Sequence, residues 1–191
     1  MRPLFALLLS LFISLPAQAG WYLDNESSRL SFISTQGGEV AEVHRFLTLH
    51  GQVLASGTVR VRVDLDSLST GVPLRDERLR TELFAQGGTP EAHLEGQVAL
   101  EAITALAPGA QLELRMPLSL TLNGQKQSLA AELLVTRLDD QRFQVVTLAP
   151  LVLQADAFGL QPGLEALGKS AGVPAIGLAV PVSAVLIFTE R

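Results

Sequence analysis

Strict alternation of apolar and polar residues is the feature that most constrains this chain. In Thr58–Asp66 the odd positions hold three valines and a leucine, and the even positions hold Thr, Arg or Asp. Gln111–Leu122 repeats the pattern, with Leu or Met at every even position. Successive side chains of a strand point to opposite faces, so each segment predicts a β-strand with one apolar face. At about 3.3 Å per residue the second strand is roughly 40 Å long, about twice the usual length.

The whole chain after residue 28 predicts an all-β fold. Asn123-Gly124 is a two-residue hairpin signal, and Asp139-Asp140 suits the next turn. Hairpins make neighbouring strands antiparallel, and long strands with one wet face favour a closed barrel. We therefore expect an eight-stranded antiparallel barrel, just wide enough for side chains or one slender ligand. The strands are expected near 29–35, 40–49, 58–66, 92–102, 110–122, 126–137, 142–154 and 178–189.

Two further segments break the strand pattern. Leu68, Val72, Leu79 and Leu83 follow helical spacing, which predicts a short helical insert directly after the third strand, lying as a lid over the sheet. A second insert, 159–177, is rich in Gly and Ala and predicts a helix near 164–169.

The last two predicted strands, by contrast, carry apolar residues on both faces. Something must therefore cover both faces: one of the inserts, a bound lipid, or a second copy of the chain as a homodimer.

The N-terminus predicts export. Arg2 precedes the apolar run Leu4–Leu15, and Ala17-Gln18-Ala19 is a typical cleavage site, so residues 1–19 form a secretory signal peptide and 20–191 a single domain. Cleavage removes one of 14 basic residues and none of 19 acidic ones, leaving a net charge of −6, which argues against nucleic acid. No later segment is apolar for long enough to span a membrane. The chain has no cysteine, which suits a soluble bacterial periplasmic protein stabilised by burial.

Candidate catalytic chemistry is sparse. Glu42 and His44 share a predicted strand face, but no short zinc-ligand motif surrounds them. The nucleophile elbow Gly-x-Ser-x-Gly is absent. A metal site or hydrolase around His44 is therefore a weak alternative.

Several motifs resemble the YceI-like family. Trp21-Tyr22-Leu23-Asp24 is similar to its mature N-terminus, and Leu120-Thr121-Leu122-Asn123-Gly124 to its Leu-Thr-Leu-x-Gly hairpin. The most specific resemblance is 67–84, where Ser-Leu-Ser-Thr-Gly leads into an Arg-Asp…Leu-Arg…Phe helix.

The resemblance implies a lipocalin-like barrel with a long tunnel, a role in binding a polyisoprenoid or other amphiphilic lipid, quinone-like ones included, and neither a cofactor nor enzymatic activity. The alternative is a solid-cored adaptor that docks on an envelope or cytochrome partner. Burial of each CH₂ contributes about 0.8 kcal/mol, so an aliphatic tunnel can hold a long tail with few polar contacts. The candidate ligand-binding residues are Val59, Val61, Val63, Phe84, Leu112, Leu114, Met116, Leu118, Leu120, Phe143 and Phe158.

Overall fold

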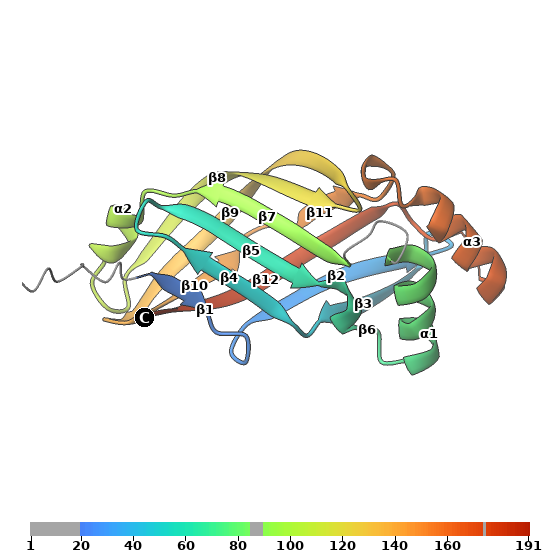
Figure 1. Cartoon of the computed structure of the whole chain (residues 1–191), viewed down its shortest axis with the longest axis horizontal. Helices are drawn as coiled ribbons and strands as arrows, with labels where there is room; N and C mark the ends of the chain where they lie inside the picture. Colours follow the sequence, from blue (N-terminus) through green and yellow to red (C-terminus); the bar gives the residue numbers. More distant parts are fainter. Residues whose placement is uncertain (1–19, 85–89, 174) are drawn as a thin grey trace, which may run out of the picture.

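A computed structural model describes residues 20–84, 90–173 and 175–191. The chain forms an elongated, curled antiparallel sheet with helices at its two ends (Figure 1). The signal-peptide prediction for 1–19 lies outside the described residues.

Within the described residues the sheet contains twelve strands. They are β1 (Trp21–Leu23), β2 (Arg29–Gln36), β3 (Val40–Phe46), β4 (Leu49–Val53), β5 (Thr58–Asp64), β6 (Leu68–Ser69), β7 (Glu91–Gln97), β8 (Gln111–Leu122), β9 (Gln125–Asp139), β10 (Arg142–Thr147), β11 (Leu151–Gln154) and β12 (Ala179–Glu190).

The sheet closes on itself as a barrel. The order β1-β4-β5-β7-β8-β9-β10-β12 returns to β1, because Trp21 pairs with Glu190 of β12 as well as with Val53 of β4. The strands β2, β3, β6 and β11 continue the wall beyond one end, with β12 pairing β2 on one edge and β11 on the other. The predicted eight-stranded antiparallel barrel is confirmed.

The turn between β8 and β9 explains the longest hairpin. Asn123 and Gly124 have φ values of +50° and +72°. These left-handed conformations match the twist of the flanking strands and favour Asn-Gly in a two-residue turn. The turn sets the register that pairs Leu122 with Gln125 and Leu112 with Val135, so it aligns the inward rows of both strands.

Some predicted boundaries are wrong. The strand expected over 92–102 ends at Gln97, and Leu100–Thr104 forms helix α2, which buries Ile103 against the barrel end. The strand expected over 142–154 is interrupted at residues 148–150, where Pro150 cannot donate a ladder hydrogen bond. The strand expected over 40–49 ends at Phe46, and Leu49 begins a separate strand, β4, that was not expected.

The helical insert lies between β6 and β7, so its expected position directly after the third strand was not exact. A 3-10 turn, η1 (Leu65–Ser67), and β6 come first; α1 (Pro73–Arg78) follows and continues into the π-helical turn η2 (Leu79–Phe84). Leu68 and Leu83 of the predicted stripe are buried, whereas Val72 is exposed because it precedes the helix as its N-cap.

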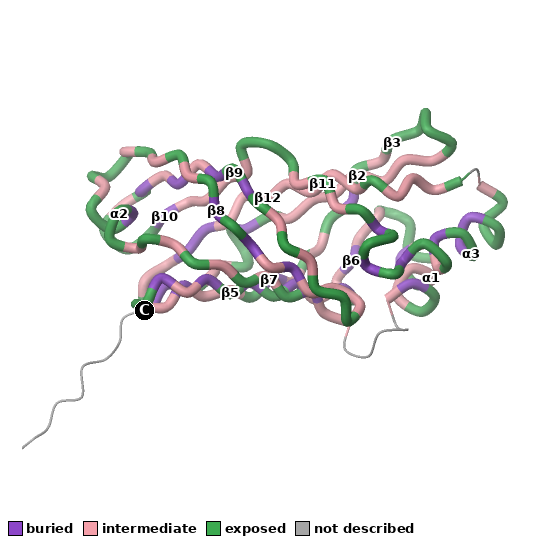
Figure 2. The backbone as a smooth tube through the Cα atoms, turned by 90° about the horizontal axis from the view of Figure 1, so that it is seen from above, coloured by how far each residue is buried: buried purple, intermediate pink, exposed green. Residues whose placement is uncertain are grey.

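A second helical segment lies at the same end of the barrel as α1. The 3-10 turn η4 (Asp156–Phe158) leads into α3 (Gln161–Ala171), which confirms the helix expected near 164–169. Both α1 and α3 lie at the end opposite α2 (Figure 1). Buried positions recur at intervals along the barrel strands and in these helices (Figure 2).

Candidate functional site

An apolar cavity of about 330 Å³ runs inside the barrel. The inward faces of β5 and β8 are the rows that alternation predicts, and their polar neighbours point outward. Rows from β7, β9, β10 and β12 add further aliphatic side chains, among them Leu94, Leu133, Val145 and Leu186. The volume falls within the range typical of small-molecule sites, about 300–1,000 Å³.

The structure places ten of the eleven candidate ligand-binding residues on the cavity wall. They are Val59, Val61, Val63, Phe84, Leu114, Met116, Leu118, Leu120, Phe143 and Phe158. Leu112 shares their face of β8 but does not line the cavity; it pairs with Val135 of β9 and packs against the buried core cluster. Nothing in the structure supports the alternative of a solid-cored adaptor.

The end of the barrel near α2 is filled by aromatic rings. Trp21 and Phe143 have ring centroids 4.6 Å apart, and Phe143 stacks on Phe188 at 5.2 Å. The guanidinium of Arg137 lies 5.0 Å from the Trp21 ring, a cation–π contact, and donates to the carbonyls of Asp139 and Asp140. All three rings are buried, so this end is packed shut.

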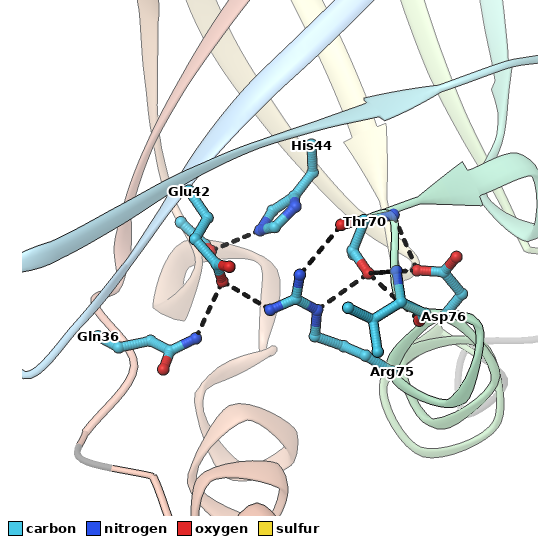
Figure 3. A network of polar contacts seen from close by, with 8 residues as sticks. Gln36, Glu42, His44, Thr70, Arg75 and Asp76 are labelled. Atoms are coloured by element: carbon cyan, nitrogen blue, oxygen red, sulfur yellow. Dashed lines mark hydrogen bonds and ion pairs between the residues drawn. The ribbon is translucent and has the colours of Figure 1, made fainter.

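The opposite end, near α1, holds a polar network (Figure 3). Arg75 donates to a carboxylate oxygen of Glu42 at 2.6 Å, and to the hydroxyl and carbonyl oxygens of Thr70. Asp76 accepts hydrogen bonds from the backbone N–H and the hydroxyl of Thr70. Arg75 and Asp76 therefore fix the insert to β3 and to the residue that follows β6, as structural pairing groups.

His44 is the most deeply buried residue of this network. It is 5% exposed, and its Nε2 lies 2.8 Å from Ser34 Oγ. Its Nδ1 is buried without a hydrogen-bond partner (Figure 3). Burial, together with the charge of Arg75, holds the pKa of His44 below its ordinary value of 6.5, so the ring is neutral at neutral pH.

The surroundings of His44 do not form the alternative sites weighed above. A Ser–His pair in a catalytic triad needs a carboxylate on the second ring nitrogen, and here that nitrogen has none. Across residues 20–84, 90–173 and 175–191, no group of three or more His, Asp or Glu side chains is placed to hold a metal ion.

Aromatic rings surround His44 on the cavity side. Phe32 lies 5.2 Å from the imidazole centroid and stacks on Phe46 at 5.3 Å, and Phe46 meets Phe84 edge-on at 6.4 Å. All four rings line the cavity. Of these rings, sequence reasoning named only Phe84 as a ligand-binding residue. The others are inward residues of β2 and β3, and the inward row of β2 changes from apolar to polar toward the hairpin tip.

The last two predicted strands, 142–154 and 178–189, which carry apolar residues on both faces, are covered on one side only. Their inner side chains line the cavity, but Leu148 and Val152 remain about half exposed on the outside. Neither helical insert covers them, because α1 and α3 lie at the barrel end. No helix within the described part of the chain is long and apolar enough to cross a membrane.

Comparisons with known proteins agree with this geometry. A polyisoprenoid binding domain from Saccharophagus degradans, implicated in plant cell wall breakdown, is 32% identical with a TM-score of 0.87, over 90% of this chain and 98% of that one. Burkholderia cenocepacia BcnA is 19% identical with a TM-score of 0.65, over 86% of this chain and 98% of its own, and shares the fold. No curated protein sequence matches.

The family pattern described as the YceI-like domain matches residues 21–188, nearly the whole of the described chain. The resemblance carried by the 67–84 segment is therefore confirmed: the chain belongs to the YceI-like family.

Proposed function

We propose that this protein is an exported carrier that binds one long-chain isoprenoid lipid, a polyisoprenoid or a quinone-like molecule, inside its barrel. The observation that carries the proposal is the cavity itself, which is closed by rings at one end and lined along its length by aliphatic side chains. The polyisoprenoid binding domain with 32% identity supports a lipid of this class.

The energetics suit a long apolar tail. A tail of fifteen carbons gains about 12 kcal/mol on burial at 0.8 kcal/mol per carbon. Association costs about 4–15 kcal/mol in lost freedom of motion, so longer tails bind with a clear surplus. The ten wall residues named above are proposed to contact the tail.

YceI-like proteins are binding proteins rather than enzymes. We propose that the present chain likewise binds its ligand without catalysis, because the neutral His44–Ser34 pair lacks the third group of a catalytic triad. We propose the periplasm as the compartment, on the basis of the signal-peptide pattern and the absence of cysteine.

Native mass spectrometry of gently purified protein tests the proposal. We expect a stoichiometric mass increment, and organic extraction should release an isoprenoid lipid. Protein that is reproducibly empty and takes up no isoprenoid from detergent solution would refute lipid carriage. Fractionation of cells expressing the full chain tests the compartment: the protein should appear in the periplasmic fraction with a mass corresponding to a start near Gly20.

A further inference from the structure

A row of apolar side chains crosses the outer face of four neighbouring strands. Val152 of β11 pairs with Pro181 of β12, and Ile33 of β2 pairs with Val43 of β3. The antiparallel register of β12 with β2 brings Pro181 beside Ile33, so the two pairs join. We call Val152, Pro181, Ile33 and Val43 the outer row. It is continuous across these strands and uninterrupted by any polar side chain.

The outer row faces solvent. Val43 is 71% exposed and Val152 is 54% exposed. No member of the row lines the cavity, whereas their chain neighbours Phe32, His44 and Leu151 do, as alternation along a strand requires. The helices α1, α2 and α3 lie at the two ends of the barrel and leave this face uncovered (Figure 1). A contiguous exposed apolar patch is typical of a surface that binds something.

The charge beside the outer row has one sign. Arg45 follows Val43 on the outer face of β3, and Arg29 lies on the outer face of β2. The outward positions of β2, β3, β11 and β12, all of them described, include no Asp or Glu. Neither arginine forms an ion pair within the described residues. The formal charge of the chain is −5, so this face is a local exception that favours an anionic partner.

This charge pattern disfavours a second copy of the chain as the partner. A two-fold symmetric dimer through the outer row would place the same face against itself. Arg29 and Arg45 of both copies would then approach each other with no carboxylate on either face to compensate them, and like charges across an interface are costly. A phospholipid surface offers the complementary environment, because its phosphates attract arginine and its acyl chains accept aliphatic side chains.

We propose that the outer row docks the barrel on an anionic phospholipid membrane. Val43 and Val152 insert at the boundary between head groups and acyl chains, and Arg45 and Arg29 contact lipid phosphates. The inference goes beyond the proposed lipid carriage and does not depend on it. Docking would hold the carrier at the surface in which isoprenoid lipids are dissolved.

Flotation of the purified protein with vesicles measures the docking. The two vesicle preparations contain phosphatidylcholine alone, or equal parts of phosphatidylcholine and phosphatidylglycerol. We expect affinity for the mixed vesicles to be about twentyfold higher, because each of the two arginines contributes about fivefold at an anionic surface. This excess should shrink as salt is raised, because salt screens exposed charges.

Two serine variants test the apolar contact. Val43→Ser and Val152→Ser should each lower affinity for the mixed vesicles about fivefold, because each removes an inserted aliphatic side chain. Leu138→Ser is the matched control: Leu138 is also exposed, but it lies on β9 next to the turn into β10, away from the outer row. It should leave the affinity unchanged. All three positions are exposed, so the variants should fold, and urea unfolding checks this.

A charge variant tests the phosphate contact. Arg45→Gln should lower affinity for the mixed vesicles about fivefold and leave affinity for phosphatidylcholine alone unchanged. Arg60→Gln is the matched control, because Arg60 is exposed on the outer face of β5, where it pairs across strands with Glu95. It should change neither affinity.

The outcomes separate docking from carriage. Protein that does not float with the mixed vesicles overturns docking, even where native mass spectrometry finds a bound lipid and carriage stands. Protein that floats but is always empty overturns carriage and leaves docking in place. Equal losses in Val43→Ser and Leu138→Ser also overturn docking. So does a dimer in sedimentation equilibrium that Val43→Ser dissociates, because the outer row would then bind a second copy.

Discussion

Glu42→Gln is predicted to change which head groups the cavity accepts. The Glu42 carboxylate compensates the charge of Arg75 across 2.6 Å, beside the cavity wall. Glutamine has nearly the same size but no charge. The substitution therefore leaves the Arg75 guanidinium uncompensated at the α1 end of the cavity, where an anionic head group could pair with it.

The size of the effect follows from the separation and the exposure of the pair. Two unit charges about 4 Å apart interact by about 1 kcal/mol in water and about 4 kcal/mol at an effective dielectric constant of 20. The side chains of Arg75 and Glu42 are 29% and 38% exposed, so solvent screens them substantially. We take about 1–1.5 kcal/mol, which corresponds to a five- to tenfold gain in affinity for a prenyl diphosphate.

The assay is the ratio of dissociation constants for diphosphate and quinone probes with equal tails, measured in the variant and in the unmodified protein. Glu39→Gln is the matched control, because it removes the same charge from an exposed position near the tip of the same hairpin. The shift should shrink as salt is raised, because salt screens exposed charges. An unchanged ratio in Glu42→Gln, or an equal shift in Glu39→Gln, would refute the reasoning.

Three further perturbations test the fold and the site. Gly57→Ala should destabilise the protein more than Gly109→Ala in urea unfolding. Both glycines have φ near +80°, a conformation that costs a non-glycine residue about 1–2 kcal/mol. Of the two, only Gly57 would place a Cβ 2.1 Å from a backbone oxygen, that of Val98. Stability should fall as pH drops below about 6.5: the pKa of His44 is lower in the folded chain, so the unfolded chain binds the proton more readily, and His44→Gln should flatten this dependence. Val61→Asp should cost about 3 kcal/mol or more by placing a charge on the cavity wall, whereas Arg60→Asp, on the outer face of the same strand, should cost less than about 0.5 kcal/mol.

Period-two alternation was sufficient to predict the cavity wall of β5 and β8. The inward or outward direction of each side chain is a local property of a strand, so Val59 and Leu118 could be assigned from their neighbours alone. The end of β7 could not be assigned in this way, because the apolar residues after Gln97 suit a strand or a short helix equally well. Only packing against the barrel end selects helix α2.

The polar end of the cavity was beyond sequence reasoning for a different reason. Ser34, His44 and Arg75 meet through the register of β2 with β3 and the docking of α1 on β6. None of these residues forms a local motif with the others. The family resemblance placed Arg75 on a helix, but the contact that fixes it, with Glu42, spans 33 positions.

The packed rings at the α2 end give the proposed carrier a fixed order of events. Because Trp21, Phe143 and Phe188 seal the α2 end, the lipid of the proposed carrier must enter and leave at the other end of the barrel. A lipid that enters tail first must then leave head first. The acceptor of the proposed lipid then contacts the head group before the tail, so it can recognise the lipid before most of the apolar contacts with the barrel are lost.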